Sequence, residues 1–231
     1  MEMVSSVELI RPRDAAFDEA LKTILGRPAD DVLKPALPYS VIVRNRDARA
    51  IALLGMRFDM LGPKAKKYSV VHYADMLRHP EKADLRTGAM RFVCAEPLYT
   101  DLVLRRESVV DQRGPMNLKN LRTMLRVSAS IDCVAFEDGQ FSGPDSLRAF
   151  ERFECEREAE IAFLAELEQG GCAAGAVLAR AMDIPAEQSR DRGLLARRAL
   201  ARRLQQGFTT GGAAEMAMLA ANHRLRLQLW R

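Results

Sequence analysis

The residues of this chain that could do acid–base chemistry are few and widely separated. Three histidines occur, His72, His79 and His223. No acid lies at a spacing from them that predicts a catalytic pair, so an enzyme site would have to be assembled by the fold. It would need a concave pocket in which two such groups meet with shifted pKa values. The candidates for that pocket are His72, His79, Asp101 and Asp138.

Motifs that carry a known chemistry are missing from the sequence. There is no G-x-S-x-G nucleophile turn, no H-E-x-x-H metal helix, no G-x-G-x-x-G and no G-x-x-x-x-G-K-[ST]. The glycine-rich segment 207–212 lacks the phosphate-binding lysine and a preceding strand, so we interpret it as a helix–helix loop. The segment 138–145 offers too few carboxylates for a calcium loop. We therefore expect no cofactor and no metal.

The cysteines do not predict a zinc site or a disulfide framework. None lies near another in the sequence, and four in 231 residues is a low density. We expect reduced thiols that are mostly buried as small apolar side chains. Two of them fall in strand-like segments and would meet only if their strands faced each other in a sheet. The four are Cys94, Cys133, Cys155 and Cys172.

The charges of the second part of the chain are arranged in two opposite blocks. Residues 144–168 hold eight acids and three arginines, whereas residues 190–206 hold six arginines and one aspartate. The simplest hypothesis is that these helices are neighbours, within one chain or across a dimer. Exposed ion pairs contribute only about 0–1 kcal/mol each, so they would orient the helices more than stabilise them.

The basic block has a competing interpretation as a nucleic-acid surface, because arginine forks suit phosphates. On a helical wheel its arginines lie opposite a row of leucines, which is typical of a solvated face. The chain carries no recognisable DNA-reading module, and aromatic residues make up only 6%. We do not expect nucleic acid as the partner, but the alternative stays open. The candidate binding residues are Arg192, Arg198, Arg202 and Arg203.

The pattern of the chain changes near residue 145. Before it, segments alternate or are β-branched and are punctuated by turn residues; after it, apolar residues recur at helical spacing. The clearest strand is 125–136, which ends in the hairpin signal Asp138-Gly139. Other strands are predicted at 4–10, 39–44, 50–59, 68–73, 90–94, 98–110 and 140–142, with a loop at 111–115. Helices are predicted at 15–25, 146–168, 173–182, 185–206 and 213–229.

These elements predict an α+β fold in three parts. Residues 1–35 form an N-terminal strand and helix extension, residues 36–143 an antiparallel β-sandwich of immunoglobulin-like type, and residues 144–231 a helical C-terminal unit. Apolar residues make up 48% and charged residues 29%, which is the balance of a globular protein. A formal net charge of +4 produces only a weak electrostatic field and implies no particular partner.

One stretch resembles a known group of proteins. The segment IDCVAFEDGQFSGPD at 131–145, with Tyr39–Asn45 and Arg49-Ala-Ile51 before it, is similar to uncharacterised bacterial proteins. In that group a hairpin of the form FEDG.F.GPD closes a β-sandwich and leads into a charged helix. The resemblance covers roughly residues 37–168 and implies the fold, whereas it assigns no activity and no catalytic residue.

The sequence therefore predicts a non-enzymatic binding or interaction module. The N-terminus shows no secretory signal, and no apolar run is long enough to span a membrane, so we expect a cytoplasmic protein without membrane contact. The apolar residues of the last helix are expected to pack on a core. A homodimer through the helical part is the second interpretation. The alternatives are an enzyme built from the scattered histidines and aspartates, and nucleic-acid binding through residues 190–206.

Overall fold

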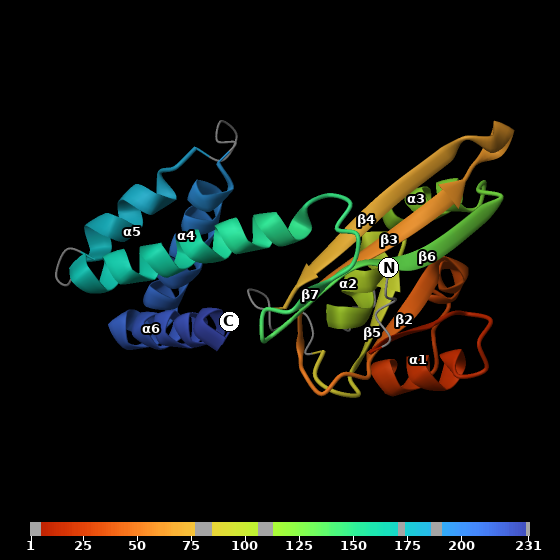
Figure 1. Ribbon diagram of the computed structural model, residues 1–231, viewed down its shortest axis with the longest axis horizontal. Helices are drawn as coiled ribbons and strands as arrows, with labels where there is room; N and C mark the ends of the chain where they lie inside the picture. Colours follow the sequence, from red (N-terminus) through yellow and green to blue (C-terminus); the bar gives the residue numbers. More distant parts are fainter. Residues whose placement is uncertain (1–5, 77–84, 106–112, 171–173, 186–190, 230–231) are drawn as a thin grey trace. The chain divides into compact units, whose positions relative to one another are not determined.

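The computed structural model describes residues 6–76, 85–105, 113–170, 174–185 and 191–229 of the chain. The chain divides into two compact units, Met1–Leu147 and Arg148–Arg231. The first holds two antiparallel sheets with short helices, and the second holds only helices among its described residues (Figure 1). The protein is thus a mixed α+β chain, as the sequence predicts.

The smaller sheet of the first unit has three strands in the order β1-β2-β5. It consists of β1 (Val7–Ile10), β2 (Ser40–Asn45) and β5 (Met90–Cys94). The central strand β2 is buried along nearly its whole length, because it pairs on both sides and is covered on both faces. Strand β1 pairs antiparallel with it, so the N-terminal extension expected from the sequence contributes a strand to this sheet.

The larger sheet has four strands in the order β4-β3-β6-β7. They are β3 (Ile51–Leu61), β4 (Lys67–Asp75), β6 (Arg126–Phe136) and β7 (Phe141–Ser142). The alternation that predicts β6 from the sequence appears as alternating exposure over its first half. In its second half the strand is buried, and one extra residue, Asp132, lies between the partners of Gly55 and Met56. This β-bulge changes the direction of the side chains at the end of the strand.

Both sheets contribute to one hydrophobic core. Its fully buried side chains include Ile42 and Phe92 from the smaller sheet and Leu54, Met56 and Phe58 from the larger one. Since alternate residues of β3 share a face, Leu54, Met56 and Phe58 line the same side of the sheet. This row of β3 residues also borders two cavities of the unit.

Two segments predicted as strand and loop are helices. Residues 98–110 were expected to be extended, but Pro97–Arg105 forms helix α2, which packs on β5. Proline suits the first helical turn, and Tyr99, Leu102 and Val103 bury one helical face, a spacing of three and four residues. Residues 111–115 were expected to be a loop, but helix α3 spans Arg113–Leu121. Residues 77–84 and 106–112 lie outside the described part of the chain.

The remaining helices of the first unit are short. Helix α1 (Phe17–Leu25) buries Phe17, Ala20 and Leu21 and ends at Gly26, whose φ of 69° is the left-handed conformation that glycine adopts readily. Two short 3-10 helices lie in the connections, η1 (Lys34–Tyr39) and η2 (Pro63–Ala65).

The second unit consists of α4 (Ala149–Gly170), α5 (Ala174–Met182) and α6 (Arg192–Leu229). Helix α6 packs against both others, and Gly193 approaches Ala159 so closely that an added Cβ would lie 3.1 Å from the Cβ of Ala159. The sequence predicts a loop at 207–212 between two helices. The break between two helices is confirmed at Gly212, whose φ of 71° and ψ of −164° are not helical, whereas residues 207–211 are helical and not a loop.

The coarse fold class is thus correct, whereas the immunoglobulin-like arrangement is not confirmed. The first unit holds sheets of three and four antiparallel strands, with helices α2 and α3 where a strand and a loop were expected. Among the described residues, no helix is long and apolar enough to cross a membrane.

Candidate functional site

A hydrogen-bond network centred on Arg49 holds the hairpin between β6 and β7. The guanidinium donates from Nε and Nη2 to the two carboxylate oxygens of Asp47, each at 2.8 Å, and from Nη1 to Oδ2 of Asp138 at 3.0 Å. It also lies 4.2 Å from the centre of the Phe136 ring. The β2–β3 turn is thereby tied to the β6–β7 hairpin. The candidate acid Asp138 is used in this structural network rather than in a pocket.

The bulge residue Asp132 holds the junction that follows β7. Its carboxylate accepts the backbone N–H of Ser146 at 3.2 Å and the Tyr73 hydroxyl at 3.2 Å, and it also accepts the Ser146 hydroxyl. The backbone of Gly143 lies so close to strand β6 that an added Cβ would come within 2.4 Å of the Asp132 carbonyl oxygen. The Gly-Pro-Asp part of the motif is therefore explained by packing against the bulge.

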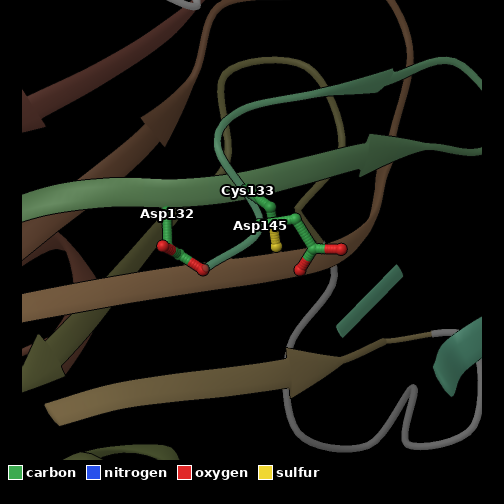
Figure 2. Close-up of side chains that lie close together, drawn as sticks. All are labelled: Asp132, Cys133 and Asp145. Atoms are coloured by element: carbon green, nitrogen blue, oxygen red, sulfur yellow. The ribbon is translucent and has the colours of Figure 1, made fainter. Parts of the chain in front are cut away.

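Asp132, Cys133 and Asp145 form a cluster whose potential ligand atoms all lie within 4.8 Å of one another (Figure 2). Burial raises the pKa of the Cys133 thiol to about 12, so the thiol is protonated at neutral pH and is a poor nucleophile. The Asp132 oxygens already accept hydrogen bonds from Tyr73 and Ser146. These contacts favour a structural role for the cluster.

The two strand cysteines do not face each other within one sheet. Cys94 is in β5 of the smaller sheet and Cys133 in β6 of the larger one, and both are free thiols. Burial raises the pKa of Cys94 to about 12, which makes it as unreactive as Cys133. Cys155 is also free, and Cys172 lies outside the described residues.

A cavity of about 300 Å³ brings together two of the candidate residues, His72 and Asp101. We call it the His72 cavity. Strands β3, β4 and β5 and the start of α2 contribute its walls. Its apolar lining includes Leu54, Met56 and Val93. The cavity therefore combines an apolar wall with a small number of polar groups, which is typical of small-molecule sites.

His72, which lines this cavity, is held by a hydrogen bond to the backbone. Its Nε2 lies 3.0 Å from the carbonyl oxygen of Ala95, and since a carbonyl only accepts, Nε2 must carry the proton. Burial lowers the pKa of His72, so at neutral pH the ring is uncharged and Nδ1 keeps its lone pair. The Phe58 ring, 5.5 Å away between centroids, fixes the ring on its other side.

Two charged groups of opposite sign line the same cavity. Arg91 is only 6% exposed, and burial lowers its pKa to about 10, with the Asp101 charge acting in the opposite direction. The guanidinium thus stays cationic at neutral pH. Asp101 is half-buried on α2, next to Thr100, whose hydroxyl oxygen accepts the backbone N–H of Cys94 at 2.9 Å. A buried arginine and a half-buried histidine, each with a pKa lowered by burial, mark this cavity as the candidate functional site.

Arg91 and Thr100 are site residues that the sequence analysis missed. Arg91 lies in the predicted strand 90–94, and period-two alternation alone does not distinguish a buried arginine from one that faces solvent. Thr100 fell in a segment predicted to be extended, where its side chain and that of Asp101 would point to opposite faces, whereas in helix α2 both line the cavity. The periodic Tyr99, Leu102 and Val103 could have revealed that helix. The candidate His79 lies outside the described residues.

The arginines of the basic block lie on α6, and two of the four candidates make contacts within the helical unit. Arg203 lies 3.7 Å from Oε1 of the buried Glu160, and Arg198 donates to the Met182 carbonyl at 3.3 Å. Arg192 and Arg202 are exposed.

The acidic helix α4 and the basic helix α6 are neighbours within one chain, as one form of the charge hypothesis expects. Besides Glu160, two further acids of α4 pair with arginines of α6, Glu166 with Arg197 and Glu168 with Arg224. Glu160 also lies 3.2 Å from Nε2 of His223, with both side chains buried. Arg197, Arg203 and Arg224 of α6 are therefore balanced by acids inside the unit.

Comparisons with protein-family models, with curated proteins and with solved structures gave no match to this chain. The observations that bear on function are therefore the charges, hydrogen-bonding groups and apolar walls that meet in the His72 cavity.

Proposed function

We propose that the first unit is a non-enzymatic binding module that takes a small zwitterion, of the α-amino acid class, in the His72 cavity. The observation that carries the proposal is the pairing of a buried cation, Arg91, with a carboxylate, Asp101, in one cavity of about 300 Å³. A zwitterionic ligand matches both groups, because its carboxylate can meet the Arg91 guanidinium and its ammonium can meet the Asp101 carboxylate.

Each lining group has a matching part of such a ligand. A guanidinium fork suits a carboxylate, because two parallel N–H donors meet two oxygens. Asp101 and the Nδ1 lone pair of His72 accept hydrogen bonds, as a primary ammonium requires. Leu54, Met56 and Val93 offer an apolar surface for a side chain. The ligand that fits all three features is a small amino acid with an apolar side chain.

Binding is favoured over catalysis by the state of the groups that could react. The Nε2–H of His72 is engaged with Ala95, and the Thr100 hydroxyl is held at the Cys94 amide. A nucleophile needs an adjacent base or a lowered pKa, whereas burial raises the pKa of the nearby Cys94 thiol. These contacts support a site that recognises a ligand.

Isothermal titration calorimetry with L-leucine tests this proposal. We use isocaproate, which lacks the ammonium, and isoamylamine, which lacks the carboxylate, as matched analogues. We expect saturable binding of L-leucine and at least about tenfold weaker binding of both analogues, because each loses one charge-assisted contact. Equal affinity for leucine and isocaproate, or no heat with leucine, rejects a zwitterion site.

The variant Asp101→Asn locates the binding. It keeps the side-chain size but removes the negative charge, so affinity for L-leucine should fall about tenfold or more. Asp18→Asn, at an exposed aspartate of α1, is the matched control and should bind as the wild type does. If Asp101→Asn binds leucine unchanged, the ligand does not occupy the His72 cavity.

A second candidate function is self-association through α6. Leu194 and Phe208, fourteen residues apart, are 38% and 47% exposed, and Met218 and Leu225, seven apart, are 55% and 58% exposed. Heptad spacing places each pair on one face of its helix. We expect light scattering to give a dimer mass that the variant Phe208→Ser reduces; a monomer at high concentration rejects the homodimer.

The immunoglobulin-like sandwich expected from the sequence is also kept as a proposal. It is supported by the seven described strands, which are all antiparallel and divide into sheets of three and four that share one core. A nucleic-acid surface is not proposed, because the acids of α4 pair with several arginines of α6.

A further inference from the structure

A second and larger cavity of the first unit is bordered by three arginines. Its volume is about 680 Å³, and its rim carries Arg11 and Arg13 from the turn after β1 and Arg126 from the start of β6. All three side chains are exposed. We call this cavity the arginine cleft. Asp14 is the one acid among its lining residues, so the rim has an excess of positive charge.

The turn that carries Arg11 and Arg13 is fixed by Asp14. The carboxylate Oδ2 of Asp14 accepts the backbone N–H of Arg11 at 2.6 Å, and the backbone N–H of Asp14 donates to the Arg11 carbonyl at 2.9 Å. Asp14 thereby serves the backbone of its own turn, as Asx residues commonly do. The two arginines project from a preorganised turn, which lowers the entropy lost when they bind a ligand.

The inner lining of the arginine cleft is apolar. Val41 and Phe58 are 3% and 1% exposed and come from β2 and β3, one from each sheet. Val127 and Ala129 of β6 add partly buried apolar surface. A ligand that fits the cleft therefore has an anionic group for the rim and an apolar body for the lining.

We propose that the arginine cleft is a separate binding site for a soluble organic anion that carries an apolar, aromatic body. Arginine forks match carboxylate, sulfonate and phosphate oxygens, and three of them around one opening favour such a group over a neutral one. Inorganic phosphate lacks the apolar body and leaves the partly buried surface of Val127 and Ala129 without a contact, so it binds more weakly.

The proposal is independent of the zwitterion site. Phe58 lines the arginine cleft and His72 lines the His72 cavity, and their rings are in contact with centroids 5.5 Å apart. Leu54, Met56 and Phe58 thus form one row along β3 that borders both cavities. The two sites share this wall but have different charges, so each can be tested with a ligand that the other does not fit.

The experiment uses anilinonaphthalene sulfonate, whose fluorescence rises when its rings leave water. We titrate the full-length protein and compare Arg11→Gln, Arg126→Gln and the double variant. The matched control is Arg122→Gln, at an exposed arginine that does not line the cleft. Circular dichroism and the midpoint of thermal unfolding confirm that each variant is folded, which excludes dye binding to a loosened core.

We expect saturable dye binding by the wild type and by Arg122→Gln. Each cleft variant should raise the dissociation constant about three- to fivefold, and the double variant about tenfold or more, as exposed charge pairs allow. The uncharged N-phenylnaphthylamine should bind equally to all variants or not at all. Dye affinity that is unchanged in the folded double variant overturns the proposal, and so does dye binding that added NaCl does not weaken.

Discussion

Arg49 donates a hydrogen bond to Asp138 across 89 positions of the sequence, with Nη1 and Oδ2 3.0 Å apart. The same guanidinium is held by both carboxylate oxygens of Asp47. Next to it, Asn45 donates to the carbonyl oxygens of Arg49 and Leu85. Residues 45–49 and the hairpin after β6, which are far apart in the sequence, are therefore parts of one contact network. This network joins the β2–β3 turn to the β6–β7 hairpin.

The variant Arg49→Lys tests this network. Lysine keeps the charge but cannot donate to Asp47 with two parallel N–H groups while reaching Asp138. We expect the free energy of unfolding to fall by about 1–2 kcal/mol, measured by urea unfolding followed by circular dichroism. Arg122→Lys is the control and should change it by less than about 0.5 kcal/mol. Equal unfolding midpoints for the two variants contradict the account of Arg49.

Gly143→Ala probes the packing of the motif against the bulge. Gly143 has φ 122°, and an added Cβ would come within 2.4 Å of the Asp132 carbonyl oxygen. Gly88 also has positive φ, 76°, but an added Cβ there meets no atom within 4 Å. We expect Gly88→Ala to destabilise the protein by about 1 kcal/mol and Gly143→Ala by clearly more, about 3 kcal/mol. Similar thermal midpoints for both variants would show that the close approach is unimportant.

Acid should lower the free energy of unfolding, in part because it protonates Asp47. The hydrogen bonds from the Arg49 side chain and backbone hold the pKa of this carboxyl well below its ordinary value of 3.8. A carboxyl with a lower pKa in the folded chain contributes stability above its unfolded pKa, and this contribution is lost as the pH falls toward the folded pKa. We expect the wild type to lose unfolding free energy below about pH 4.

Asp47→Asn removes this contribution at all pH values. Its unfolding free energy should be lower than that of the wild type at neutral pH, and the difference should shrink as the pH falls below about 4. Urea unfolding at a series of pH values gives the comparison. A constant difference across the series means that Asp47 has the same pKa in both states.

Glu160 is expected to anchor the helical unit. It is only 1% exposed and lies 3.2 Å from Nε2 of His223 and 3.7 Å from Arg203. Glu160→Gln removes the charge while it keeps the shape, so the unit should lose about 1–3 kcal/mol. Glu158→Gln, two residues earlier at an exposed position, is the matched control. Hydrogen exchange of the α4 amides should accelerate in the first variant, and equal rates in both would contradict a role for Glu160.

The strands were largely predictable, whereas two helices were not. Period-two alternation identified β6, because the first half of that strand has one solvent-exposed face and one partly buried face. Pro97 was interpreted as the end of a strand, although proline equally begins a helix. The apolar Tyr99, Leu102 and Val103 carry the helical spacing, but a nine-residue window gives too few turns to outweigh the β-branched residues around it.

The candidate site was predictable only in part, for a reason of topology. His72 and Asp101 were chosen for their chemistry, and the fold brings them into one cavity. Arg91 could not be chosen, because its burial depends on strand β5 pairing with β2 and on the helix that follows β5. Such long-range contacts leave no spacing signal in the sequence.

The most direct test of the central claim is a histidine NMR titration with L-leucine. The ring signals of His72 are assigned with the variant His72→Gln, and those of His223 serve as an internal reference in the other unit. In the free protein at neutral pH we predict a His72 ring protonated at Nε2 and not at Nδ1. L-leucine should shift the Nδ1 signal of His72 with the affinity measured by calorimetry and leave His223 unchanged. A His72 signal that stays constant throughout the titration would contradict the zwitterion site.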